Sequence, residues 1–197
     1  MNIEYEATFF PVDKDEVRQR LRQAGAELAR PEFTQRRMNF NLPAGHEIKG
    51  AWVRVRDEGD KISLTLKVVD GDRIENQKEI ITEVSDFEAT QRFLENIGCT
   101  PKAFQETRRE LWKLGEVEIM IDEWPWLRPF VEVEGKSEAA VREVSEKLGF
   151  DYTQAKFCAV DTLYAQEYGI TKDEINYTQE VAFDLENPFT SSSKNNL

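Results

Sequence analysis

Several residue types and motifs are scarce in this 197-residue chain, and each absence excludes a class of protein. A single histidine, His46, leaves too few parts for a histidine-based catalytic triad or zinc site. The only two cysteines, Cys99 and Cys158, lie far apart without metal-ligand spacing, which favours a reducing, cytoplasmic compartment. The glycine-rich phosphate loop with its lysine is also missing, so a P-loop enzyme is not supported.

Long apolar runs are missing as well. No stretch of about 18 apolar residues occurs, so we expect no membrane-spanning helix. The N-terminus has acidic residues in a strand-like pattern instead of the features of a signal peptide. The formal net charge of -12 argues against broad binding to nucleic acid or to an anionic membrane. A local basic site for a phosphorylated small molecule remains compatible with this charge.

The first residues of the chain show a clear pattern. Apolar and polar residues alternate from Ile3 to Phe9, which predicts a β-strand with Glu4, Glu6 and Thr8 on one face. Two carboxylates side by side on a strand repel each other, and a metal ion or cationic groups would be a reason to hold them there. Taken alone, this strand fits a solvated face better than a site.

The rest of the chain predicts more strands than helices. Further strands are predicted over residues 33–42, 51–56, 62–68, 73–84, 103–114, 117–122 and 130–135. Helices are predicted over residues 13–25, 85–98, 137–149 and 159–168, the first with a capping box between Asp13 and Glu16. Because the strands do not alternate regularly with helices, a doubly wound parallel sheet is not expected.

The fold class that follows is α+β, with an eight-stranded antiparallel β-barrel and helices packed outside it. We expect residues 1–170 to form this barrel domain. Residues 171–197 are interpreted as a C-terminal extension with a weak pattern, and residues 191–197 are expected to be disordered.

Most of the predicted strands have one apolar face and one face rich in ionisable groups. The helices must cover apolar faces, so a closed sheet would turn its charged faces into the barrel. For Glu79, Glu83 and Glu118 a solvated position stays an equal alternative. The other charged positions on these faces are Glu4, Glu6, Arg37, Arg54, Arg56, Lys67, Arg109, Asp122, Glu132 and Glu134.

A confined space lined by both signs of charge suits an anionic, metal-bound ligand. Carboxylates bind hard cations such as Mg²⁺ or Mn²⁺ through oxygen, and Arg and Lys bind phosphate oxygens. These residues therefore predict a polyphosphate or a nucleoside triphosphate as the ligand.

Over roughly residues 3–168 the chain resembles the CYTH, or triphosphate tunnel metalloenzyme, family. That family includes class IV adenylate cyclases, thiamine triphosphatases and inorganic triphosphatases. The matching stretches are Glu4-Tyr5-Glu6, Asn39-Phe40-Asn41-Leu42-Pro43, Trp52-Val53-Arg54-Val55-Arg56, Leu64-Thr65-Leu66-Lys67, Arg109, Ile121-Asp122 and Phe130-Val131-Glu132-Val133-Glu134-Gly135. The order and spacing of these stretches carry the resemblance.

The resemblance implies a metal-dependent reaction on a small-molecule triphosphate. The Mg²⁺ or Mn²⁺ ligands would be Glu4, Glu6, Asp122, Glu132 and Glu134. The substrate-binding residues would be Arg37, Arg54, Arg56, Lys67 and Arg109. The catalytic group would be Glu4, Glu6, Arg54, Arg56, Lys67 and Arg109.

Two departures from the family pattern leave the reaction open. Thr8 and Thr107 stand where the family has lysines, and Arg37 replaces an acidic residue. We expect a triphosphatase, with a class IV-like adenylate cyclase as the alternative. A non-catalytic triphosphate-binding or nucleotide-binding module is a third hypothesis, and the sequence leaves the oligomeric state open.

Overall fold

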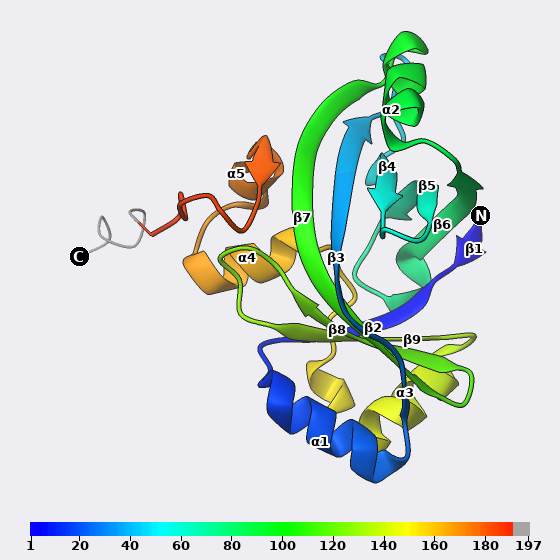
Figure 1. Cartoon of the computed structure of the whole chain (residues 1–197), viewed down its shortest axis with the longest axis vertical. Helices are drawn as coiled ribbons and strands as arrows, with labels where there is room; N and C mark the ends of the chain where they lie inside the picture. The colour runs from blue at the N-terminus through cyan, green and yellow to red at the C-terminus, as the bar shows by residue number, and fades with distance from the viewer. Residues whose placement is uncertain (191–197) are drawn as a thin grey trace.

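The computed structural model describes residues 1–190, so the predicted disorder of residues 191–197 lies outside the described part. A strongly curved antiparallel sheet forms the body of the molecule, with helices around its outside (Figure 1). The strands are β1 (Asn2–Ile3), β2 (Tyr5–Phe9), β3 (Glu27–Asn41), β4 (Ala51–Asp57), β5 (Ile62–Val69), β6 (Gln77–Val84), β7 (Thr100–Leu114), β8 (Val117–Glu123), β9 (Phe130–Gly135) and β10 (Glu180–Val181). The helices are α1 (Lys14–Ala24), α2 (Phe87–Asn96), α3 (Glu138–Lys147), α4 (Asp161–Tyr168) and α5 (Lys172–Asn176).

The first predicted strand closes the barrel. The strand order is β1-β6-β5-β4-β3-β7-β8-β9-β2, so β1 and β2 stand at opposite ends of the sheet. These two strands are halves of one segment interrupted at Glu4, whose backbone N–H donates to the carbonyl of Gln77 at 3.0 Å. Since one segment pairs with β6 on one side and β9 on the other, the predicted eight-stranded antiparallel barrel is confirmed.

The helices lie outside the barrel, where they cover its apolar strand faces. Helices α1 and α3 lie together against β2, β8 and β9 (Figure 1). Outward residues such as Ala7, Ile119 and Val133 are completely buried beneath these two helices. Helix α2 covers another part of the barrel, where it buries Phe40 and Val55. The inward faces of the same strands are therefore free to be polar.

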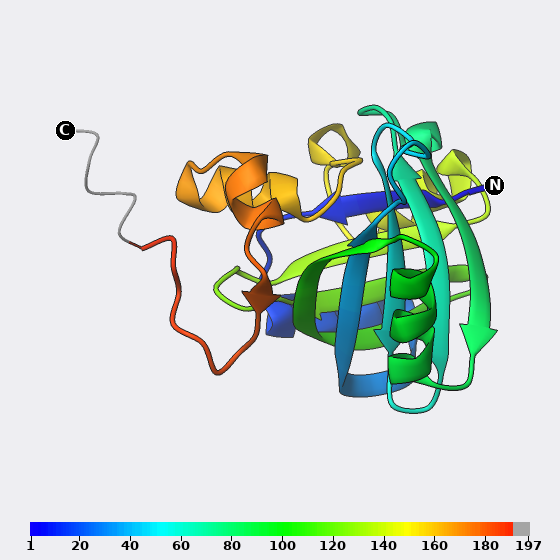
Figure 2. The same ribbon diagram turned by 90° about the horizontal axis from the view of Figure 1, so that it is seen from above.

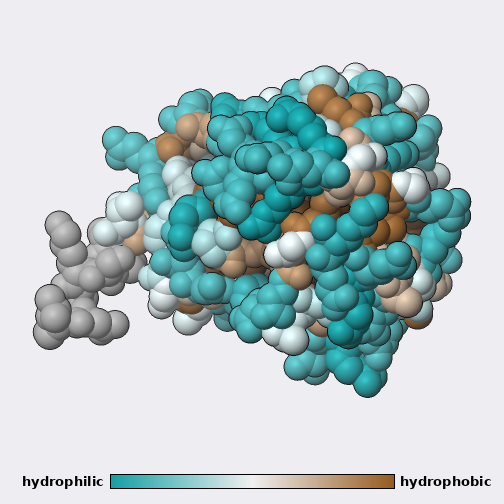
Figure 3. Space-filling model, turned by 90° about the horizontal axis from the view of Figure 1, so that it is seen from below, coloured by the Kyte–Doolittle hydropathy of each residue, from teal (hydrophilic) through white to brown (hydrophobic). Residues whose placement is uncertain are grey.

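Seen from the side of α1 and α3, the surface is mostly hydrophilic, with limited hydrophobic areas between charged side chains (Figure 3). No helix within residues 1–190 combines the length and the apolar character that a membrane span needs.

The C-terminal segment, here residues 161–190 from α4 onward, packs beside one side of the barrel (Figure 2). Strand β10 pairs in parallel with β7, and Phe104 N–H donates to the carbonyl of Gln179 at 2.8 Å. A second apolar core joins this segment to the β8–β9 connection. Its buried members are Trp124, Leu127, Phe130, Leu163, Tyr164, Ile170, Ile175, Val181 and Phe189.

Three local expectations need correction. The strand predicted from residue 73 begins at Gln77, because residues Ile74–Asn76 form a single 3-10 turn after the 70–72 turn. Asp13 caps α1 by accepting from the N–H of Glu16, but the Glu16 carboxylate pairs with Arg20 instead of completing the capping box. Helix α5 and strand β10 were not expected, because both are too short for a periodic pattern.

Candidate active site

The interior of the barrel contains a cavity of about 810 Å³. All ten residues assigned from the sequence to metal or substrate binding line it. They come from β2, β3, β4, β5, β7, β8 and β9 and from Glu4, the residue between β1 and β2. Glu79 and Glu118 also line the cavity, Glu118 with a side chain that is 42% exposed and pairs with Lys113, whereas Glu83 is exposed outside it.

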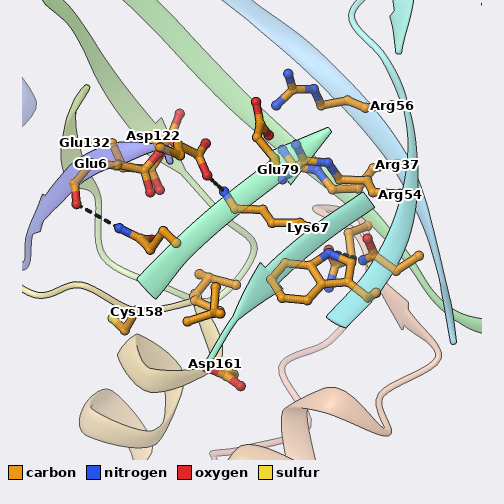
Figure 4. Close-up of a pocket in the computed structure, with 18 of the residues that line it drawn as sticks. Glu6, Arg37, Arg54, Arg56, Lys67, Glu79, Asp122, Glu132, Cys158 and Asp161 are labelled. Atoms are coloured by element: carbon orange, nitrogen blue, oxygen red, sulfur yellow. Dashed lines mark hydrogen bonds and ion pairs between the residues drawn. The ribbon is translucent and has the colours of Figure 1, made fainter. Parts of the chain in front are cut away.

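Positive and negative side chains occupy different parts of the cavity. Figure 4 shows Arg37, Arg54 and Arg56 together on one side and Glu6, Asp122 and Glu132 on the other, with Lys67 between them. Strand register produces this separation, because Arg37 pairs across β3 and β4 with Arg56, while Glu6 pairs across β2 and β9 with Glu134.

Three carboxylates converge at one point in the cavity. Glu4, Glu6 and Glu134 each offer an oxygen within 4.8 Å of the other two, and we call them the acidic cluster. Burial, with the charges of Glu4 and Glu134 added, raises the pKa of Glu6 to about 8. Burial and the charge of Glu4 raise the pKa of Glu134 to about 7. Bringing these groups together in their charged form is therefore unfavourable without a cation.

Lys67 supplies part of the compensating charge. Its Nζ lies 2.8 Å from Oε2 of Glu4, and the two side chains are only 11% and 8% exposed. Burial acts to raise the pKa of Glu4, but the charge and hydrogen bond of Lys67 outweigh it and lower that pKa.

Asp122 and Glu132 are held by Arg109 instead of joining the acidic cluster. Arg109 donates to the two carboxylate oxygens of Asp122 at 2.7 and 2.5 Å and to Oε2 of Glu132 at 2.6 Å. Burial alone would lower the pKa of Arg109, but these two carboxylates raise it well above its usual value. The five acids assigned to metal binding are therefore divided between two neighbouring groups.

The three arginines on the opposite side, Arg37, Arg54 and Arg56, form what we call the arginine group. Arg56 has a carboxylate partner, because its Nε lies 2.8 Å from Glu58 Oε1. Arg54 is 8% exposed and makes no ion pair within residues 1–190, where its Nε also has no hydrogen-bond partner. Burial, with the charge of Arg54 added, lowers the pKa of Arg56 to about 10, so Arg56 remains charged near neutral pH.

Among residues 1–190, the side-chain partners of Arg37 are all uncharged. Its Nη2 donates to Gln35 Oε1 and to Thr107 Oγ1, both at 2.6 Å. Its guanidinium carbon lies 4.8 Å from the ring centroid of Trp124. Burial and the nearby charges of Arg54 and Arg56 lower the pKa of Arg37 well below its usual value.

Sequence reasoning missed the roles of Gln35, Thr107 and Trp124. Gln35 and Thr107 stand two residues before Arg37 and Arg109 and therefore share their inward strand faces, so the strand period could have identified them. Nothing in the sequence indicated the contact between Trp124 and Arg37, because it joins β3 to the residue after β8. Thr8, the other position where a lysine was expected, is 3% exposed and pairs through its backbone with Lys156.

Comparisons with solved structures confirm the fold. The PH1012 protein from Pyrococcus horikoshii is 21% identical, with a TM-score of 0.69 over 81% of this chain and 98% of that one. A candidate adenylate cyclase from Vibrio parahaemolyticus is 12% identical, with a TM-score of 0.71 over 83% and 98%. A candidate adenylyl cyclase from Hippeastrum, described as having a dominant triphosphatase activity, is 13% identical, with a TM-score of 0.58 over 86% of this chain and 96% of that one.

Sequence comparison gives a more specific result. A search of curated proteins finds no match to this chain. The model of the CYTH domain family, however, matches residues 2–163, which include every strand of the barrel. The resemblance expected from the sequence motifs is therefore confirmed, and the chain belongs to the CYTH domain family.

Proposed function

We propose that this protein binds a small-molecule triphosphate with Mg²⁺ or Mn²⁺ inside the barrel and hydrolyses it. The observation that carries the proposal is the pair of buried guanidinium groups on Arg37 and Arg54, which have no carboxylate partner within residues 1–190. An unpaired buried charge is strongly unfavourable, so such groups are expected where an anionic ligand completes them. Phosphate oxygens suit arginine, which can bind them through two parallel hydrogen bonds.

The acidic cluster fits the metal that this chemistry requires. Glu4, Glu6 and Glu134 provide oxygen ligands, which Mg²⁺ and Mn²⁺ prefer. Burial and neighbouring carboxylates raise the pKa values of Glu6 and Glu134, and a nearby divalent cation would favour their charged forms. A bound divalent ion would neutralise charge on the phosphate chain by acting as a Lewis acid. Asp122 and Glu132 remain proposed ligands, and they would become available if Arg109 exchanged them for phosphate oxygens.

The cationic residues would divide the remaining tasks. Arg37, Arg54 and Arg56 would bind the phosphate chain along β3 and β4. Lys67 and Arg109 stand closer to the acids, where they would stabilise charge that develops on the transferred phosphoryl group. In hydrolysis the nucleophile is a water molecule, and the leaving group is the remaining phosphate chain.

A class IV-like adenylate cyclase is the second candidate. The likeness of the fold to the candidate adenylate cyclase from Vibrio parahaemolyticus supports it. Hydrolysis stays the first choice, because the Hippeastrum relative in fold is described as having a dominant triphosphatase activity. A module that binds without turnover is the third, supported by the uncharged Thr8 and Thr107. A cytoplasmic location is proposed with each of them.

The experiment incubates the protein with ATP, thiamine triphosphate or inorganic triphosphate, each with Mg²⁺ or Mn²⁺. Phosphate release supports the hydrolase, cyclic AMP with pyrophosphate supports the cyclase, and tight binding without products supports the module. Glu6→Gln should abolish turnover, whereas Glu83→Gln, at an exposed position near the end of β6 and outside the cavity lining, is the matched control and should retain it. Absence of both binding and turnover with all three compounds would refute the proposal.

A further inference from the structure

We propose that Trp124, which packs against the C-terminal segment, positions Arg37 for the anionic ligand. This inference rests on the proposed function, because it takes the phosphate chain as the ligand of Arg37. It goes beyond that function in assigning a role to Trp124 and to residues that follow the family-matched part of the chain.

The contacts of Arg37 leave part of its guanidinium group available. Gln35 and Thr107 accept hydrogen bonds from the same nitrogen, Nη2, at 2.6 Å each. The buried Nε has no hydrogen-bond partner within residues 1–190. Trp124 contacts the guanidinium through its ring face, which attracts the positive charge without accepting any N–H in a hydrogen bond. The indole can therefore restrain the cation while its remaining donors stay free for a ligand.

Trp124 is itself fixed by the C-terminal segment. Its ring lies 6.5 Å from that of Tyr164 in an edge-to-face arrangement, and Tyr164 is completely buried. The Tyr164 hydroxyl donates to the carbonyl of Pro125 at 2.6 Å, which ties α4 to the residue after Trp124. The family match ends at residue 163, so Tyr164 lies just beyond it. Contacts thus run from α4 through Trp124 to Arg37.

A purely structural role for Trp124 is the alternative, and Trp126 gives the comparison. Trp126 also packs on the C-terminal segment, with its ring 5.9 Å from Phe189 and its Nε1 donating to the carbonyl of Leu185. Trp124 lines the cavity and contacts Arg37, and Trp126 is not among the cavity-lining residues. A substitution at Trp126 therefore disturbs similar packing without touching the arginine.

A double-mutant cycle tests the proposal. The affinity for inorganic triphosphate with Mn²⁺ is measured by calorimetry for the wild type, Trp124→Leu, Arg37→Gln and the double variant. We expect Trp124→Leu to weaken binding by about 2- to 30-fold when Arg37 is present. It should have no further effect in the Arg37→Gln background, where Arg54 and the acidic cluster still support residual binding. Trp124→Phe keeps a ring face and should recover most of the affinity, and Trp126→Leu should leave it unchanged.

An equal loss from Trp124→Leu in both backgrounds would overturn the proposal, because Trp124 would then act independently of Arg37. A separate readout does not require any ligand. The Arg37 side-chain proton resonances, identified by their absence in Arg37→Gln, should carry a ring-current shift that Trp124→Leu removes, and an unchanged shift would contradict the contact. Failure of the wild type to bind triphosphate would refute the proposed function, and the resonance test would still decide whether Trp124 holds Arg37.

Discussion

Lys67 Nζ lies 2.8 Å from Oε2 of Glu4, so this lysine forms an ion pair with one member of the acidic cluster. Both side chains are nearly inaccessible to solvent, so the buried charge of each is compensated mainly by the charge of the other. Removing one partner of a buried pair leaves an uncompensated charge, which is far more harmful than losing an exposed pair.

Lys67→Met is therefore expected to lower the free energy of unfolding of the metal-free protein by about 3–5 kcal/mol at pH 8. Chemical denaturation measures this change. Lys78→Met is the matched control, because Lys78 pairs with Asp70 at 3.2 Å with about a third of each side chain exposed. The control should change stability by less than about 1 kcal/mol. Equal effects of the two substitutions would contradict the account of the buried pair.

The stability of the metal-free protein should fall as pH rises from 4.5 towards 8. Glu6 and Glu134 have pKa values of about 8 and 7 in the folded chain, against 4.5 ordinarily. In this range the folded state binds more protons than the unfolded state, so the free energy of unfolding decreases with pH. The decrease is of the order of 1–5 kcal/mol. Denaturation curves at several pH values should show it.

Glu6→Gln should flatten this pH dependence, because the amide does not titrate. Mn²⁺ should bind more tightly across the same window as the carboxyl groups lose their protons, and its binding should release protons. A metal-free protein that becomes more stable between pH 5 and 8 would contradict the raised pKa values.

Substitution of Arg54 should affect binding and stability in opposite ways. Arg54→Met removes a buried charge that has no ion-pair partner within the described chain, so stability should stay constant or rise. Triphosphate affinity should fall by about 10- to 150-fold, as expected for losing a hydrogen bond to a charged group. Arg56→Met is the comparison, because it breaks the pair with Glu58 and should therefore lower stability. Thermal unfolding and calorimetry measure the two quantities.

The strand faces, the helices and the barrel were predictable because alternation and capping are local properties. Period 2 placed Glu4 and Glu6 on one face, and the need for helices to cover the apolar strand faces turned that face inward. The partners within the cavity were not predictable. Lys67 faces Glu4, and Arg109 holds Asp122, through strand registers and side-chain conformations that no local pattern contains. Helix α5 was missed because its five residues are too few to show a period.

The domain boundary predicted at residue 170 stays a prediction, and one substitution tests it. Phe189 is 5% exposed in the core that joins the C-terminal segment to the barrel, whereas Tyr177 is 80% exposed. Phe189→Ala should lower the free energy of unfolding by about 3–5 kcal/mol in a single cooperative transition. Tyr177→Ala should change it by less than about 0.5 kcal/mol. A separate early transition in the Phe189 variant would instead support an independent extension.

The central claim is that the acidic cluster binds a divalent cation and the arginine group binds a triphosphate in one cavity. Crystals grown with Mn²⁺ and inorganic triphosphate test it most directly, because the anomalous signal of manganese locates the metal. We expect a manganese peak among the carboxylates of Glu4, Glu6 and Glu134, with phosphate density on Arg37 and Arg54. A cavity without manganese, or triphosphate bound elsewhere on the molecule, would contradict the claim.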